Sequence, residues 1–239
     1  MGIKERQERD RESVRRAILD AARDLFVVEG YQNVSIRKIA ERIEYSPAAI
    51  YSYFPSKDDI FFALAEEGFR ILSDSEQIGD LDGAGTVDPL DRIRTIFWRL
   101  YEFSRDHPEH FALMFVERTV PRITREYERF TFVREMKNRI VGHIQRCIDA
   151  KSLPSDVNPL IACRLLTMGL LGVAVMRLSD RLGPGENADD LARDVINVVI
   201  AGLRAGVSLQ STAAACAEEE KAQLELSQQQ IVTHQGVAR

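Results

Sequence analysis

Helix-boundary signals crowd into residues 35–57, and they restrict this segment to short helices joined by tight turns. Ser35 is placed to accept a hydrogen bond from an unpaired backbone N–H at the start of one helix. Ser46 is placed to do the same for a second helix. Pro47 takes the first position of that second helix, where a missing N–H costs nothing. The spacing therefore predicts two helices that meet at a turn just before Ser46.

The second of these helices, predicted at residues 47–54, must end within a few residues. Pro55 cannot continue a helix and favours extended backbone at Phe54. Ser56 and Asp59 then form a capping box that opens a third helix. Apolar side chains spaced by three and four give one buried face to each helix. They are Ile36, Ile39, Ala40 and Ile43, then Ile50 and Phe54, and upstream Val14, Ala17, Ile18, Ala21, Ala22, Leu25 and Phe26. The pattern predicts a three-helix domain complete by about residue 55.

Two short helices with exposed aromatic and hydroxyl groups on the second are typical of a helix-turn-helix that reads DNA. In such domains the N-terminal end of the second helix meets base edges, and small side chains there permit close approach. Surrounding hydroxyl and cationic groups suit phosphate contact. The predicted DNA contacts are Ser35, Arg37, Tyr45, Ser46, Pro47, Ala48, Ala49, Tyr51, Tyr53 and Lys57. For Tyr45, a place in the core is the alternative.

Residues 11–64 resemble the N-terminal domain of the TetR (tetracycline-repressor-like) family of bacterial transcription regulators. The residues that match the family pattern are Arg37, Ile39, Ala40, Ser46, Ile50, Tyr51, Tyr53, Phe54, Lys57 and Leu64, preceded by Gly30-Tyr31 and Val34-Ser35. The expected fold is all-α. An N-terminal three-helix helix-turn-helix domain is followed by a larger helical domain for ligand binding and dimerisation.

Two positions depart from the family pattern. Glu44 stands in the turn where the family often has glycine, so either Glu44 adopts left-handed backbone or the turn differs. Pro47 and Ala48 replace a frequent Lys/Pro–Gly pair. This second departure changes the expected base preference but not the expected fold.

The composition is that of an ordinary soluble protein. Of 239 residues, 45% are hydrophobic and 29% are charged, and the formal net charge is −5. The charged N-terminus does not fit a signal peptide. The longest uncharged apolar run, residues 165–176, corresponds to a helix of about 18 Å, short of the ~30 Å hydrocarbon core of a bilayer. We therefore expect a cytoplasmic protein with no membrane-spanning segment.

Helical patterns continue along the rest of the chain. The predicted helices are 57–74, 89–106, 108–119, 121–151, 158–181 and 188–207. The predicted regions are a DNA-binding domain at 1–56, a ligand-binding and dimerisation domain at 57–207, and a polar tail at 208–239, helical or disordered. The charged residues before the first helix leave two interpretations open, a solvated frayed leader and an arm that touches DNA.

The last two long helices are apolar on more than one face, which indicates two packing partners for each. One partner is the core of the same chain, and the second is predicted to be another copy of the chain. The family resemblance implies the same pairing. The predicted homodimer contacts are Val173, Val195, Val198, Val199, Gly202 and Gly206, with Gly169 and Gly172 also permitting close backbone approach. A large monomeric core is the alternative.

Aromatic residues are unusually dense in residues 93–116, and apolar surroundings with a few polar groups are typical of a small-molecule pocket. The predicted lining is Phe97, Trp98, Tyr101, Phe111, Met114, Phe115, His143, Met168, Gly172 and Met176. The same pattern fits a plain hydrophobic core equally well.

No pattern in the sequence predicts catalysis, a metal site or a cofactor. A Ser-His-Asp elbow, a Gly-rich phosphate loop and paired carboxylates in an apolar setting are all missing. His107 and His110 have the spacing of a metal pair, but Pro108 separates them and no third ligand is suggested. They are interpreted as polar residues at a helix start. Cys147 and Cys163 are interpreted as core residues.

We therefore predict a homodimeric, ligand-responsive transcription regulator. It would act as a repressor on a palindromic operator in double-stranded DNA and be released by a small apolar effector. In a two-fold dimer the recognition helices would lie about one DNA turn, ~34 Å, apart. The alternatives are a ligand-independent architectural DNA-binding protein and an enzyme.

Overall fold

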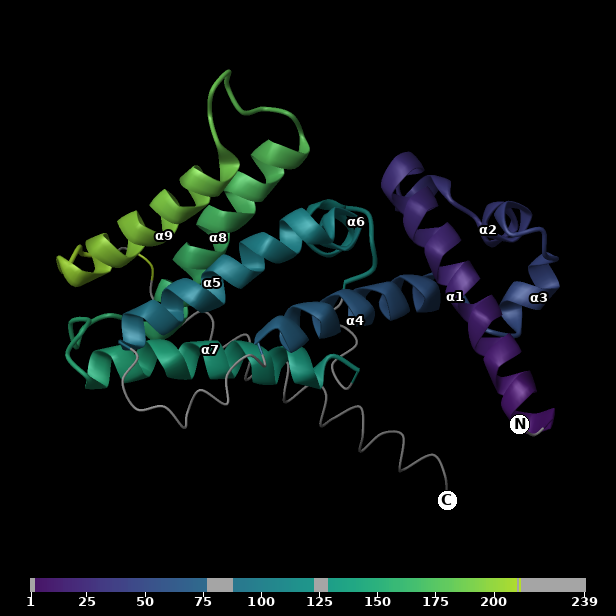
Figure 1. The fold of residues 1–239 in the computed structure, drawn as a ribbon, viewed down its shortest axis with the longest axis horizontal. Helices are drawn as coiled ribbons and strands as arrows, with labels where there is room; N and C mark the ends of the chain where they lie inside the picture. Colours follow the sequence, from purple (N-terminus) through teal and green to yellow (C-terminus); the bar gives the residue numbers. More distant parts are fainter. Residues whose placement is uncertain (1–2, 77–87, 123–128, 210, 212–239) are drawn as a thin grey trace. The chain divides into compact units, whose positions relative to one another are not determined.

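A computed structural model describes residues 3–76, 88–122, 129–209 and 211, and these residues are helical with no strand (Figure 1). The chain divides into two compact units. The first comprises residues 1–83, 99–126 and 174–183, and the second comprises 84–98, 127–173 and 184–239. The predicted tail, from 208 onward, lies almost wholly outside the described residues. The all-α fold class expected from the sequence is confirmed.

The helices and their bounds follow the chain in this order. The first unit contains α1 (Ile3–Glu29), η1 (Tyr31–Asn33), α2 (Ile36–Arg42), α3 (Pro47–Tyr51), α4 (Lys57–Glu76), α6 (Pro108–Phe111) and η3 (Ala112–Val116). The second contains α7 (Thr131–Asp149) and α9 (Ala188–Arg204). The boundary between the units passes through α5 (Pro89–Asp106) and α8 (Pro159–Leu178).

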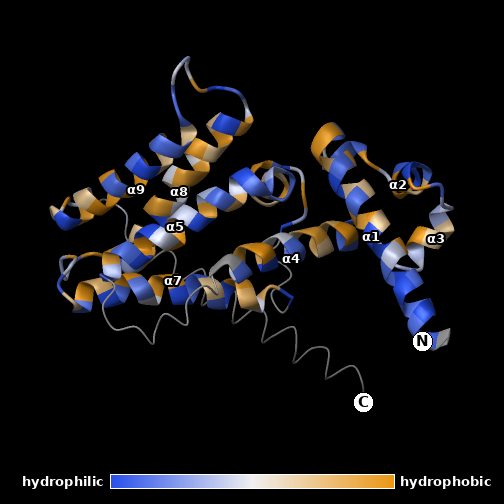
Figure 2. Ribbon diagram, viewed as in Figure 1, coloured by the Kyte–Doolittle hydropathy of each residue, from blue (hydrophilic) through white to orange (hydrophobic). Residues whose placement is uncertain are grey.

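The helix-turn-helix is built on the faces that the apolar spacing predicts. Ile18, Ile39 and Ile50, from α1, α2 and α3, are fully buried together with Phe61 and Leu64 of α4. Transfer of a branched aliphatic or aromatic side chain out of water stabilises a fold by about 1.5–3 kcal/mol. Five such groups from four helices therefore hold these helices as one body. Figure 2 shows hydrophobic (orange) and hydrophilic (blue) segments interspersed along these helices.

The caps predicted from the sequence are present. Ser35 Oγ accepts a hydrogen bond from Lys38 N at 3.2 Å, and Ser46 Oγ accepts one from Ala49 N at 3.2 Å. Glu44 has a φ of 60°, so the turn keeps the left-handed backbone that glycine commonly provides. Tyr45 N donates to the carbonyl of Ala40 at 2.9 Å and closes the turn.

One helix prediction, residues 108–119, is wrong in its length and type. Pro108 does start a helix, but α6 ends at Phe111 and continues as the π-helical turn η3, which ends at Val116. Gly68 of α4 faces this turn, and a Cβ there would overlap the sulfur of Met114. The wider π-helical turn is accompanied by close packing of η3 on α4. The local sequence gives no signal for this packing.

The predicted helix at 121–151 begins later than expected. In the described part of this range α7 starts at Thr131, and residues 123–128 lie outside the description. The recognition helix is also shorter than the predicted 47–54, because α3 ends at Tyr51 and a turn carries the chain to Phe54. The remaining helices agree with their predicted ranges to within three residues at each end.

The second unit is held by contacts of α9 with α8 and with the start of α5. Gly169 of α8 lies so close to Val195 of α9 that a Cβ would come within 2.5 Å of Val195 Cγ1. Arg94 Nε of α5 donates to Asn197 Oδ1 at 3.3 Å, and the Arg193 guanidinium lies 4.6 Å from the Trp98 ring centroid. The close approach at Gly169 is thus within one chain.

The apolar run at 165–176 lies inside α8, which is slightly shorter than the predicted helix at 158–181. α8 has 20 residues, about 30 Å, so helix length does not exclude a membrane span, although the apolar run alone is too short for one. Among the described helices, α8 has the length and composition for one, with a mean hydropathy of 1.9 and 39% of that stretch buried. A core helix in a soluble protein has the same properties.

Candidate nucleic-acid interface

The first turn of α3 is an exposed and closely approachable surface. Ser46, Pro47 and Ala48 are exposed, and Ala49 is half-buried. On the opposite side Ile50 is fully buried and anchors the helix in the core. The Ser46 cap fixes the start of the helix, so its small side chains are presented outward with little freedom to rearrange. Such a tip can enter a DNA groove without a steric obstacle.

Tyrosine side chains flank this tip. Tyr45 is 45% exposed and Tyr51 is 54% exposed, so the alternative that Tyr45 is a core residue is wrong. Tyr53 is half-buried, and the guanidinium of Arg11 lies 6.0 Å from its ring centroid. Phenolic hydroxyls donate hydrogen bonds well to phosphate oxygens. Tyr45 and Tyr51 are therefore positioned to contact a duplex beside α3.

The two cations predicted to contact phosphate have different surroundings. Arg37 is exposed and pairs with Glu41 at 2.8 Å, an exposed pair of a kind that contributes little to stability. Lys57 is partly buried, and its Nζ donates to the carbonyls of Tyr31 at 2.8 Å and Val34 at 3.0 Å. Burial lowers the pKa of Lys57, although Asp58 opposes the shift. Lys57 thus ties the start of α4 to the chain before α2.

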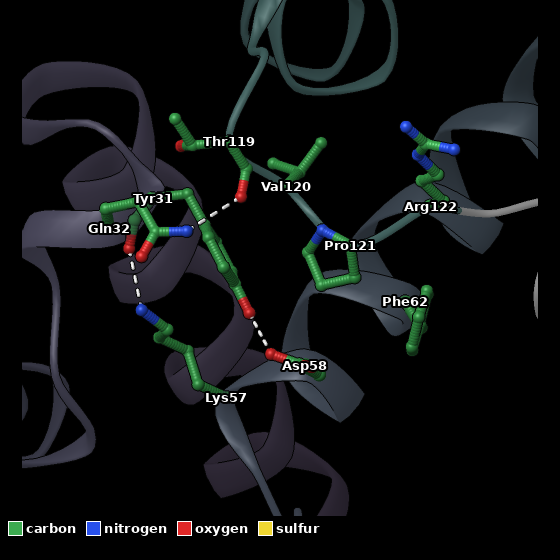
Figure 3. Close-up of a pocket in the computed structure, with 9 residues that line it drawn as sticks. All are labelled: Tyr31, Gln32, Lys57, Asp58, Phe62, Thr119, Val120, Pro121 and Arg122. Carbon is green, nitrogen blue, oxygen red and sulfur yellow. Dashed lines mark hydrogen bonds between the residues drawn. The ribbon is translucent and has the colours of Figure 1, made fainter.

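The segment after η3 docks onto the same region. Gln32 Nε2 donates to the carbonyl of Thr119 at 2.9 Å, and the Tyr31 hydroxyl donates to Asp58 (Figure 3). Glu117 accepts from the backbone N–H of Thr119 at 2.9 Å. Burial raises the pKa of Glu117, but hydrogen bonds from the backbone N–H and hydroxyl of Thr119 and from the backbone N–H groups of Arg118 and Tyr31 outweigh burial and lower that pKa. The helix-turn-helix is thereby joined to the chain that follows α6.

A cleft of about 440 Å³ lies at this junction. Tyr31, Gln32, Lys57, Asp58, Phe62, Thr119, Val120, Pro121 and Arg122 line it (Figure 3). The hydrogen bonds of Tyr31, Gln32 and Lys57 described above are made within the protein, so they do not point to a ligand. The cleft therefore marks the contact between the helix-turn-helix and the segment after η3.

A partly buried polar cluster joins α1, α4 and α6. Arg16 of α1 donates to Glu67 of α4 at 2.7 Å and to Asp20 at 2.6 Å. His110 of α6 is 5% exposed, and its Nε2 lies 3.4 Å from Glu67 Oε1 without a hydrogen bond to any described residue. Burial lowers the pKa of His110; Glu67 opposes this, while Arg23, His107 and Arg16 add to it. His110 is therefore neutral near pH 7.

The lowered pKa of His110 predicts a stability that depends on pH. Histidine in an unfolded chain titrates near about pH 6.5, so below that value the unfolded chain binds more protons than the folded chain. The free energy of unfolding should therefore fall as the pH is lowered from 7.5 to 5.5, with at most about 1.4 kcal/mol per pH unit from one histidine. Urea unfolding of the wild type and of His110→Gln tests this. The variant should show the shallower pH dependence, and parallel curves would contradict the assignment.

The residues predicted to form a dimer interface occupy different environments. Val198 is 69% exposed, and Gly202 and Val199 are half-buried. Val173 is buried within the chain, and Val195 packs on Gly169. Gly206 has a φ of 71° and ends α9, so its backbone conformation explains the glycine. On α9, Val198 is thus the predicted interface residue most available to a second copy.

The predicted pocket residues fall in both units. Phe97, Tyr101 and Phe111 are buried, whereas Trp98, Met114, Phe115 and His143 are half-buried. Met168 and Met176 are exposed, as is Gly172, so one chain alone does not enclose them. Within the described residues, no group of three or more His, Cys, Asp or Glu could hold a metal ion. Cys147 and Cys163 are buried, and burial raises the pKa of Cys147 to about 11.

Comparison with known proteins agrees with this architecture. Residues 18–64 match the family model of bacterial regulatory proteins of the tetR family, and residues 93–199 match a tetracyclin repressor-like C-terminal domain. The nucleoid occlusion factor SlmA of Vibrio cholerae is 32% identical over 146 residues, which cover 58% of this chain and 70% of SlmA. The transcriptional repressor Rv1474c of Mycobacterium tuberculosis is 45% identical over 53 residues, 22% of this chain and 28% of that protein.

Solved structures show the same fold. PfmR, a TetR-family regulator from Thermus thermophilus, superposes on this chain with a TM-score of 0.62 at 19% identity. The superposition covers 78% of this chain and 98% of PfmR. FadR from Bacillus subtilis, solved in complex with stearoyl-CoA, gives a TM-score of 0.62 at 15% identity, over 78% of this chain and 97% of FadR.

The exposed α3 tip, its capped partner α2 and the larger helical domain define a helix-turn-helix DNA-binding protein. More narrowly, the chain belongs to the TetR family of bacterial transcription regulators. Proteins of this family are DNA-binding regulators and are generally not enzymes.

Proposed function

We propose that the chain is a dimeric, effector-responsive repressor that binds an inverted-repeat operator through α3. The observation that carries the proposal is the exposed first turn of α3, where Ser46, Pro47 and Ala48 stand opposite the buried Ile50. Ala48 and Ala49 would approach base edges, and an alanine methyl can contact a thymine methyl. The groups that would contact phosphates around them are Ser35, Arg37, Tyr45, Tyr51, Tyr53 and Lys57.

The domain division proposed from the sequence accompanies this function. Residues 1–56 would bind DNA, residues 57–207 would bind the effector and form the dimer, and residues 208–239 would be a polar tail. The dimer would form through α8 and α9, where Val198 and Met168 are exposed apolar side chains. The protein would act in the cytoplasm, where the bacterial chromosome is located.

The effector is proposed to be a small apolar molecule held among the aromatic residues of the larger domain, including Phe97, Tyr101 and Phe111. The first class to test is a long acyl chain carried on coenzyme A, of which the acyl chain is the apolar part, because FadR, which has the same fold, was solved with stearoyl-CoA. Coupling to DNA would pass through the contacts of Gln32 with Thr119 and of Arg16 with Glu67. An effector that prefers the non-binding state by ~1–3 kcal/mol weakens DNA binding 5- to 150-fold.

The experiment measures operator binding with and without effector. Molecules that co-purify with the chain are identified by mass spectrometry, and labelled duplex from upstream of its own gene is titrated by fluorescence anisotropy. We expect stearoyl-CoA, or the co-purified molecule, to weaken binding within the 5- to 150-fold range. Free coenzyme A is the control and should have no effect. Binding that no such molecule changes would favour a ligand-independent architectural protein.

A further inference from the structure

The N-terminal third of α1 has no buried residue among those that the structure describes. α1 is continuous from Ile3, yet its first buried residue is Ile18, and residues 4–13 are all exposed. At 1.5 Å per residue these ten positions extend about 15 Å beyond the packed part of the helix. Figure 1 shows this end of α1 projecting past α3, and Figure 2 shows that it is hydrophilic. It is therefore an ordered helical arm.

One face of this arm is cationic, and it is the face that points toward the helix-turn-helix. Steps of three and four residues back from the buried Ile18 lead to Arg15, Arg11 and Lys4, with Gln7 and Glu8 beside them. The stripe that is apolar inside the domain therefore becomes basic beyond its edge. Three cations and one carboxylate share this face. Elsewhere on the arm, the three carboxylates Glu5, Asp10 and Glu12 outnumber the two cations Arg6 and Arg9.

Two of these cations lie against the segment that follows the recognition helix. The guanidinium of Arg15 is 5.3 Å from the Phe54 ring centroid, and that of Arg11 is 6.0 Å from the Tyr53 ring centroid. Contact with an aromatic face holds a guanidinium in place. The structure describes no ion pair that neutralises Arg11 or Lys4, while Arg15 meets Glu12 at 3.5 Å. The basic face therefore lies against the segment that follows α3, and it carries cations that no described ion pair neutralises.

We propose that Lys4, Arg11 and Arg15 bind the phosphate backbone next to the groove that α3 enters, so that α1 extends the DNA-contact surface. This inference rests on the proposed DNA-binding function. A duplex is the occupant that fits, because the face is cationic and adjoins the recognition helix, and because DNA carries one negative charge per ~1.7 Å of its axis. Glu8 lies on the same face and weakens the contact.

The salt dependence of DNA binding tests the arm. Each phosphate contact adds about 0.9 to the slope of log K against log[salt]. The Lys4→Gln/Arg11→Gln double variant removes two cations from each chain and four from the dimer, so it should flatten the slope by about 3.6. Glu8→Gln should tighten binding. Arg6→Gln is the matched control, because it removes the same charge from a position about 140° around the helix from Arg11. Circular dichroism and light scattering establish that each variant is folded and dimeric.

The outcomes separate this inference from the function on which it rests. A slope flattened in the double variant and unchanged in Arg6→Gln supports the arm. If Arg6→Gln flattens the salt slope as much per removed charge as the double variant does, the arm contact is overturned, because net charge alone would then explain the effect. A wild type that binds duplex with the same slope as the double variant also overturns it, and leaves the proposed function standing. A wild type that binds no duplex removes the proposed function itself.

Discussion

Replacing Val198 with aspartate is expected to convert the dimer into a monomer. Val198 is 69% exposed on α9, so its side chain is not needed to hold one chain together. In a two-fold interface each copy would place one new carboxylate against apolar neighbours. Burying an unpaired charge costs about 3–5 kcal/mol, which is ~100-fold or more in the dissociation constant. Operator binding should fall with it, because one chain carries a single recognition helix.

Asn197→Asp is the matched control for this substitution. It adds the same charge one residue earlier on α9, about 100° around the helix. Arg94 Nε already donates to Asn197 Oδ1, so the new carboxylate has a cationic partner. Light scattering should show a dimer for the wild type and Asn197→Asp and a monomer for Val198→Asp. A Val198→Asp dimer would place the interface elsewhere.

The second large effect is expected at the tip of α3. Ala48→Glu should weaken operator binding ~100-fold or more, which corresponds to a loss of about 2.7 kcal/mol in binding free energy. Ala48 is exposed at the second position of the helix, where an acidic residue interacts favourably with the helix dipole. The fold should therefore be at least as stable as before. In the complex, however, the larger anionic side chain would meet base edges between two phosphate backbones.

Ala48→Ser is the companion variant. Its side chain is small and neutral, so binding should survive with at most a change in base preference. Thermal unfolding reports whether either substitution disturbs the domain. Full operator binding by Ala48→Glu, with an intact fold, would mean that α3 does not enter the duplex at this position.

The helix-turn-helix could be predicted from the sequence because its boundaries are set locally. Ser35, Ser46 and Pro47 act on backbone groups within three residues of themselves, so their effect is visible in the sequence. The left-handed backbone of Glu44 was one of two alternatives, and only the structure decides between them. Local rules suffice where the deciding contact is near in sequence.

Features that depend on distant residues could not be predicted. The π-helical turn that follows α6 packs closely against Gly68, more than forty residues earlier. Lys57 is predicted to contact phosphate, a prediction that stays open, and the contacts of its ammonium with the carbonyls of Tyr31 and Val34 have no sequence signal. The sequence shows that such a side chain is cationic. It does not show which of several nearby acceptors the folded chain brings within reach.

The apolar face of the C-terminal helices was ambiguous for a related reason. Residue type alone does not distinguish an exposed valine from a buried one, so Val173 and Val198 are both predicted to be dimer contacts. In the structure one is buried within the chain and the other is exposed. A periodic pattern identifies apolar faces, and only packing decides which face remains uncovered.

Selection from a random pool of duplexes tests the central claim most directly, that α3 presents its first turn to a DNA groove. The purified full chain is mixed with the pool, and the bound sequences are recovered and counted. An inverted repeat with half-sites about one helical turn apart should be enriched by the wild type and lost with Ala48→Glu. If the wild type enriches no sequence, or if Ala48→Glu enriches the same one, the claim is contradicted.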